Sequence, residues 1–155
     1  PTEMVTANDI KKTGTSYGVF ERLAALCSPP TWVDLDPLTG FQGDNSTQLG
    51  YGYQRLQITK NAYTGRVELR GHIYATSSST LAEGTAVNII SIPSGYRPPK
   101  HYYHSVTVNG ANDSSECRTW PMRILTNGTA TLYVDSDTTA QYLIYLDNIF
   151  WYVDV

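Results

Sequence analysis

Apolar and polar side chains alternate along most of this chain. Between Arg66 and Ala75, the apolar residues Val67, Leu69 and Ile73 are separated by charged or polar ones. A period of two predicts a strand with one face on a core and the other toward water. Similar stretches, bounded by turn residues about every 8–12 positions, predict further strands at 31–35, 51–59, 85–92, 102–108, 122–126, 129–134 and 141–153. The last stretch is either one long strand or two that break near Asp147-Asn148.

The start of the chain follows a different pattern. Residues 1–14 are polar, and we expect them to be a linker or the end of an upstream module. Over residues 16–26 the apolar side chains have the spacing of one short helix. Pro29-Pro30 ends that helix, because proline lacks the N–H group and restricts the residue before it.

The sharpest local signal is Asn127-Gly128, which stands between two apolar, β-branched stretches. This pair predicts a two-residue hairpin loop with a type I′ turn. Taken together, the elements predict an all-β sandwich or barrel of about eight strands with one short N-terminal helix. We expect residues 15–155 to form this single domain, since a chain of 155 residues has the length of one core.

Composition narrows the possible functions. Hydrophobic residues make up 41% of the chain and the net charge is −3, which excludes a disordered segment. The 11 basic residues face 14 acidic ones without clustering, so neither nucleic acid nor an anionic membrane is an expected partner. The 12 tyrosines against 3 Phe and 3 Trp are the notable excess. Tyrosine joins an apolar ring to a polar tip and suits binding surfaces.

Candidate catalytic and metal-ligating groups are sparse. Cys27 and Cys117 predict two free thiols, although sequence spacing leaves a disulfide open. His101 and His104 lie on a predicted strand, where residues three apart point to opposite faces, so we expect no metal site. The pairs Asp34/Asp36 and Asp135/Asp137 could each be half of a calcium site or a glycosidase pair, but turn chemistry, in which Asp bonds its own backbone two residues on, is the favoured explanation. We expect no cofactor.

A saccharide site is the best candidate for chemistry. Sugar C–H faces stack on aromatic rings, while carboxylates, amides and guanidinium groups bind the hydroxyls. Trp120 is close in sequence to a polar loop, and an aromatic strand precedes that loop. If the two strands are neighbours, as chain order favours, their side chains could converge. The candidate ligand-binding residues are Trp120, His101, Tyr103, His104, Asp113 and Arg118. The alternatives are that Trp120 belongs to the core and that the 101–104 run is half core and half exposed.

Four motifs, in this order, resemble tail proteins of phages that infect Gram-positive bacteria. They are Trp32-Val-Asp-Leu35 with Leu38-Thr-Gly-Phe41, Tyr53 to Thr59 with Thr64-Gly-Arg-Val-Glu-Leu-Arg-Gly71, Ile92-Pro-Ser-Gly-Tyr-Arg-Pro98, and Met122 to Val134. Together they cover roughly residues 31–134 of the chain. The chain departs from the family at Phe41, where tryptophan is more frequent, and in its aromatic tail Phe150-Trp-Tyr152.

The resemblance implies a receptor-binding head domain of a baseplate, tail tip or fibre. Such heads are jelly-roll-like or barrel folds, usually homotrimers, which attach to cell-wall saccharides of the host without catalysis. The implied location is the virion tail, acting at the bacterial surface beside other tail and baseplate proteins. Two alternatives stay open, namely a structural virion domain that binds only other virion proteins, and a polysaccharide depolymerase. The depolymerase would need two carboxylates about 5–5.5 or 6.5–9.5 Å apart in a cleft.

Overall fold

The computed structural model describes residues 29–43, 55–76, 81–110, 113–135 and 142–154, with the backbone alone for residues 110, 113–116 and 142. These residues form two antiparallel sheets and one 3-10 turn, η1 (Ser94–Tyr96). The four-stranded sheet has the order β1 (Val33–Asp34), β3 (Gln57–Lys60), β4 (Arg66–Arg70), β11 (Ile149–Tyr152). The seven-stranded sheet has the order β2 (Phe41–Gly43), β5 (His72–Ala75), β10 (Tyr142–Tyr145), β7 (Tyr102–Gly110), β8 (Asp113–Ile124), β9 (Thr129–Tyr133), β6 (Ala86–Ser91).

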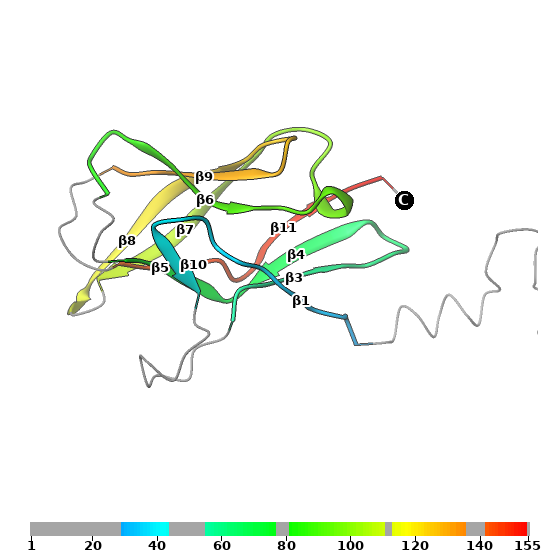
Figure 1. Cartoon of the computed structure of the whole chain (residues 1–155), viewed down its shortest axis with the longest axis horizontal. Helices are drawn as coiled ribbons and strands as arrows, with labels where there is room; N and C mark the ends of the chain where they lie inside the picture. The colour runs from blue at the N-terminus through cyan, green and yellow to red at the C-terminus, as the bar shows by residue number, and fades with distance from the viewer. Residues whose placement is uncertain (1–28, 44–54, 77–80, 111–112, 136–141, 155) are drawn as a thin grey trace, which may run out of the picture.

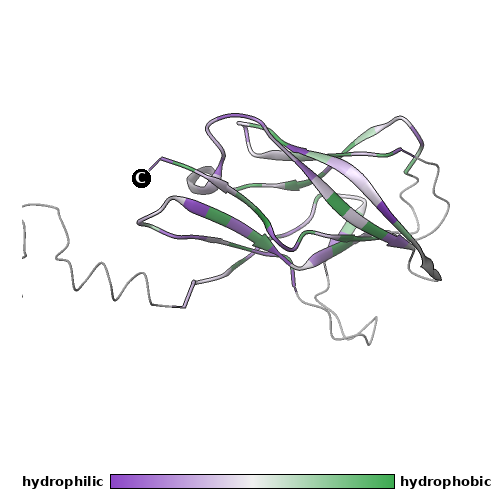
Figure 2. Cartoon of the chain, turned by 180° about the vertical axis from the view of Figure 1, so that it is seen from behind, coloured by the Kyte–Doolittle hydropathy of each residue, from purple (hydrophilic) through white to green (hydrophobic). Residues whose placement is uncertain are grey.

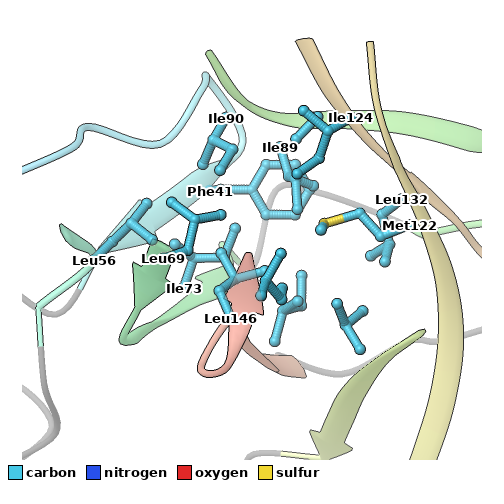
Figure 3. Packing of buried hydrophobic residues seen from close by; sticks show 14 of the residues in the cluster. Phe41, Leu56, Leu69, Ile73, Ile89, Ile90, Met122, Ile124, Leu132 and Leu146 are labelled. Atoms are coloured by element: carbon cyan, nitrogen blue, oxygen red, sulfur yellow. The ribbon is translucent and has the colours of Figure 1, made fainter. Parts of the chain in front are cut away.

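The predicted all-β sandwich or barrel is confirmed, and the described residues contain more strands than the pattern suggested. Several strands are shorter than predicted, but β7 continues to Gly110 and β8 begins at Asp113, inside the stretch expected to be a polar loop. Figure 1 shows β6, β8 and β9 of the larger sheet on one side of the molecule and β3 and β4 of the smaller sheet on the other. Apolar side chains from both sheets meet between them in one cluster, part of which is shown in Figure 3. This cluster includes Ile58, Leu69 and Trp151 from the smaller sheet and Ile73, Trp120 and Leu132 from the larger one.

Strand β4 shows how alternation becomes structure. Val67 and Leu69 are fully buried, while Arg66, Glu68 and Arg70 are partly or fully exposed on the opposite face. The same change of polarity from residue to residue is visible along the strands in Figure 2. The period of two therefore predicted both the element and its buried face.

The predicted single strand from 66 to 75 is wrong, because the chain bends at Gly71. This glycine has a φ of 95°, a left-handed conformation that side chains disfavour, and it separates β4 from β5 in the other sheet. Gly71 N–H donates to Asp147 Oδ1 at 2.9 Å, and its carbonyl accepts from Leu146 N–H at 2.9 Å. The stretch 141–153 breaks at this same corner into β10 and β11. Two segments thus change sheets side by side.

The corner also changes which side chains are buried. The alternation between Arg66 and Ala75 placed His72 and Tyr74 on the solvent-exposed face together with Arg66. In the structure these two residues are only 2% and 7% exposed. Beyond the corner, β5 lies between β2 and β10 and is buried on both faces. The Tyr74 hydroxyl donates to Gln42 Oε1 on β2.

The hairpin at Asn127-Gly128 exists, but its turn differs from the expected type I′. That turn needs a positive φ at both residues, and of these two only Gly128 has one, at 91°. Gly128 N–H donates to the Leu125 carbonyl and Leu125 N–H to the Thr129 carbonyl, each at 2.9 Å. The loop is therefore three residues long, with glycine in the left-handed position.

Some of the predicted features fall on residues outside the described ranges. The helix at 16–26, the linker at 1–14, Cys27 and Asp137 belong to this group. Cys117 is described, and it is a free, exposed thiol. No helix among the described residues is long and apolar enough to cross a membrane.

Candidate functional site

The strands that carry the predicted site residues are neighbours, as chain order suggested. Strands β7 and β8 pair antiparallel, with Val106 opposite Trp120 and Thr107 opposite Thr119. Residues that are opposite each other share a face of the sheet. This register therefore decides which predicted residues can meet.

Three of the predicted residues lie at positions of β7 and β8 that alternate with the exposed ones and face the core. Trp120 is 0% exposed and belongs to the core cluster, so its ring is not available to a surface ligand. His104 is half-buried, and its ring stacks on Tyr102 with centroids 6.3 Å apart. Burial lowers the pKa of His104 below its ordinary 6.5. Arg118 is opposite Val108, which is fully buried.

The other predicted residues lie elsewhere. Tyr103 is on the outward alternation of β7 and is 68% exposed. His101 precedes the strand and accepts a hydrogen bond at Nδ1 from Thr126 N–H at 3.3 Å. Asp113 begins β8, and only its backbone is described. The described side chains of the predicted set are therefore divided between the two faces of one sheet, because successive residues of a strand point to opposite sides.

The outer face of β7 borders a surface hollow that sequence reasoning missed. Strand β10 ends at Tyr145, which is opposite Thr107, so the stretch of β7 before Thr107 has no β10 partner. The chain then turns through Asp147 and Asn148 toward the other sheet. The space between this turn and β7 is a hollow of about 410 Å³, which lies in the size range of small-molecule sites. Its lining consists of Ser105, Val106, Thr107, Asn109, Cys117, Tyr145, Asp147 and Asn148.

The corner that joins the two sheets holds the turn of this hollow in place. The Asp147 carboxylate accepts from Gly71 N–H through Oδ1, and Leu146 N–H donates to the Gly71 carbonyl. Asn148 has a φ of 63°, which asparagine tolerates better than most side chains. Asp147 and Asn148 are both exposed. The sequence signal for this turn was the Asp-Asn pair inside an aromatic stretch, but nothing in the sequence placed it beside β7.

The hollow combines hydrogen-bonding groups with one aromatic ring. Ser105 and Thr107 bring hydroxyls, Asn109 and Asn148 bring amides, and Asp147 brings a carboxylate. The half-buried Tyr145 ring lies 6.0 Å from the ring of His72, centroid to centroid. Hydroxyl and amide groups both donate and accept, so they suit a ligand rich in hydroxyls.

A second hollow, of about 530 Å³, lies beside the β3–β4 hairpin, but its polar groups are engaged within the protein. Lys60 Nζ donates to the Gly95 carbonyl at 3.4 Å, and the Asn61 side chain accepts from two loop N–H groups. Arg66 and Glu68 form an ion pair at 3.1 Å. The smaller hollow is therefore the better candidate for a ligand.

The outer face of the four-stranded sheet carries an exposed aromatic pair, Phe150 and Tyr152. They are 41% and 48% exposed, and their rings meet edge to face at 6.3 Å. The Arg66 guanidinium lies 4.6 Å from the centre of the Phe150 ring. Exposed aromatic residues beside arginine are typical of surfaces that contact other proteins.

Of the acidic pairs from the sequence, Asp137 lies outside the described residues, and Asp34 is held by neighbouring side chains. Asp34 accepts hydrogen bonds from Gln57 at 2.6 Å and from Arg55 at 3.1 Å. The hydrogen bond from Gln57, followed by the interactions with Arg55, lowers the Asp34 pKa below its ordinary value. A glycosidase acid needs a raised pKa, so Asp34 is unsuited to that role. Among the described residues, no group of three or more His, Cys, Asp or Glu could hold a metal ion.

Comparison with known proteins finds similar folds among solved structures. No protein-family model matches the chain, and no curated protein matches it. The receptor-binding protein gp15 of Listeria phage PSA superposes with a TM-score of 0.61 at 16% identity, over 88% of this chain and 72% of that one. The head domain of phage bIL170, studied among the receptor-binding domains of lactococcal phages, gives 0.54 at 15% identity, over 82% and 99%. The chain therefore has the fold of phage receptor-binding domains, which confirms the expected resemblance at the level of fold.

Proposed function

We propose that this chain is a phage tail adhesin domain that binds a cell-wall saccharide of a Gram-positive host without catalysis. The observation that carries the proposal is the hollow between β7 and the Asp147–Asn148 turn, which combines hydroxyls, amides, a carboxylate and a tyrosine ring. The fold shared with two phage receptor-binding proteins supports the tail location. We further propose that residues 15–155 are the head domain and that residues 1–14 link it to an upstream module.

The residues predicted from sequence have distinct roles in this proposal. Tyr103 lies on the same outward alternation of β7 as Ser105 and Thr107, one outward position before the first lining residue of that strand. His101 comes just before that strand. Trp120 supports the sheet from its buried side. His104, Arg118 and Asp113 were also predicted contacts, but none of them belongs to the lining of the hollow, so this proposal does not depend on them.

A homotrimer belongs to the same proposal. A shallow hollow of this size is suited to weak binding by each head, and linked copies raise the effective concentration of the remaining sites. The aromatic pair Phe150 and Tyr152 is the surface we assign to contact between copies, because exposed rings beside Arg66 favour protein contact. The mass of the purified protein in solution tests this, and Phe150→Ala with Tyr152→Ala is expected to weaken assembly.

The same aromatic pair favours a second candidate function, that of a structural virion domain. In that case Phe150 and Tyr152 contact another tail protein, and the hollow binds nothing.

Binding to isolated cell walls separates the two functions. The purified domain is mixed with walls from a panel of Gram-positive strains, before and after chemical removal of wall polysaccharide. The adhesin is expected to bind selected strains and to lose binding with the polysaccharide, with no release of sugar reducing ends. Release of reducing ends would indicate a depolymerase, and absence of binding to every wall would favour the structural domain.

Matched variants locate the site. Thr107→Val and Tyr145→Ala change the hollow and are expected to reduce wall binding. Thr119→Val is the control, because Thr119 is the β8 residue opposite Thr107 but does not line the hollow. Equal binding by Thr107→Val, Tyr145→Ala and the control would rule out this hollow as the site.

Cys117 gives an independent readout, because its exposed thiol lines the same hollow. In a Cys27→Ser background, a bound saccharide is expected to slow alkylation of Cys117. Unchanged alkylation at a saccharide concentration that saturates binding would place the ligand elsewhere.

A further inference from the structure

The described residues that line the hollow between β7 and the Asp147–Asn148 turn carry a negative charge and no positive one. Among its described lining residues, the only formal charge is the Asp147 carboxylate, and the remaining polar groups are hydroxyls, amides, a phenol and a thiol. A carboxylate repels a phosphate or a second carboxylate, and it accepts hydrogen bonds from hydroxyls. The lining therefore distinguishes ligands by charge.

The position of Asp147 is fixed by the fold. Its Oδ1 accepts from Gly71 N–H at 2.9 Å at the corner where both chain segments change sheets. Asp147 is itself exposed and belongs to the lining, so its negative charge lies at the edge of the hollow.

The arginines of the neighbouring strand do not line this hollow. Arg123 shares the outer face of β8, but its guanidinium lies 5.5 Å from the centre of the Tyr133 ring on β9, on the side away from β7. Arg118 is opposite Val108 on the inward alternation. Neither side chain is part of the lining.

We infer that the hollow selects neutral, hydroxyl-rich saccharide units and rejects sugars that carry phosphate or carboxylate groups. This inference rests on the proposed saccharide-binding function and specifies its ligand class. Asp147 sets the discrimination, since it repels anionic ligands while it accepts hydrogen bonds from hydroxyls.

The test uses fragments of wall polysaccharide from a strain whose walls bind the protein. Anion exchange separates these fragments into a neutral and an acidic pool, and dissociation constants are measured for both at low salt. The wild-type protein is expected to prefer the neutral pool. Asp147→Asn keeps an oxygen that accepts from Gly71 N–H, and it is expected to raise the acidic-to-neutral affinity ratio by about fivefold or more. High salt is expected to shrink that change.

Two further variants keep the test decisive. Asp154→Asn removes one negative charge at an exposed residue outside the hollow and is expected to leave the ratio unchanged. Asn148→Asp adds a carboxylate to the lining and is expected to lower the ratio. A wild-type preference for the acidic pool, or an unchanged ratio in Asp147→Asn and Asn148→Asp, would overturn the inference and leave the adhesin function standing. Failure of all walls and fragments to bind would overturn both.

Discussion

Gly128 lies where two turns of the fold touch, and its replacement by alanine is expected to destabilise the protein strongly. Its φ of 91° is left-handed, and a Cβ there would lie 2.5 Å from the Ile92 carbonyl oxygen and 2.7 Å from Arg97 Nε. The Gly128 carbonyl also accepts from Ile92 N–H at 2.8 Å, so the backbones cannot separate freely.

The expected loss of stability in Gly128→Ala has two parts, one from the backbone conformation and one from close contacts. A left-handed conformation costs alanine about 1–2 kcal/mol, partly offset by about 0.4–1 kcal/mol from a less flexible unfolded chain. Forced contact with packed atoms costs about 1–3 kcal/mol. Gly128→Ala is therefore expected to lower the free energy of unfolding by about 2–4 kcal/mol, and the melting temperature by about 5–15 °C.

Two other glycines provide matched controls for this series. Gly84 has a φ of 73°, but a Cβ added there would have no neighbouring atom within 4 Å. Gly84→Ala is therefore expected to lose stability only through the left-handed backbone conformation, without a steric clash. Gly95 has neither a left-handed φ nor a near neighbour, so Gly95→Ala is expected to be within about 1 kcal/mol of wild type. Urea unfolding of the three variants measures the differences. Equal losses in Gly128→Ala and Gly84→Ala would refute the argument that close approach of the two turns matters.

Three further predictions concern buried and titrating groups. Trp151→Phe removes the 2.7 Å hydrogen bond from Nε1–H to the Tyr96 carbonyl and leaves a cavity, so urea unfolding should show a loss of about 2–4 kcal/mol. Burial lowers the His104 pKa below 6.5, so its contribution to stability is complete above that pH and declines as the pH falls toward the folded pKa. His104→Gln should flatten this part of the pH profile, and an identical slope in both proteins would contradict the assignment. The lowered Asp34 pKa, set first by Gln57, gives stability above the ordinary value of 3.8 that is lost as the pH falls through the folded pKa. Any advantage over Asp34→Asn in thermal melts should therefore disappear in acid.

The fold was accessible from the sequence wherever local pattern and tertiary environment agree. In β4, Val67 and Leu69 are buried as the alternation predicted, because one face of that strand meets the core and the other meets water. At the Asn127-Gly128 hairpin the position was correct but the turn type was wrong. The hydrogen bonds of Leu125 and Thr129 decide how many residues the loop contains, and sequence reasoning had no means to determine that register.

The candidate site depended more heavily on tertiary structure. The sequence identified β7 and β8 as neighbours and indicated saccharide chemistry, but the pairing register placed Trp120 inside and Tyr103 outside. The hollow is formed where β10 ends beside β7 and the chain turns at Asp147. Thr107 and Asp147 are distant in sequence, so no local pattern could relate them.

The sequence by itself determined the all-β class, the alternation within strands such as β4 and the position of the hairpin at Asn127-Gly128, because these depend on each residue and its near neighbours. Tertiary structure alone decided where the chain changes sheets at Gly71, which face of each strand is covered and which polar groups share a hollow. These depend on pairing between distant segments, whose register is set by packing across the whole core.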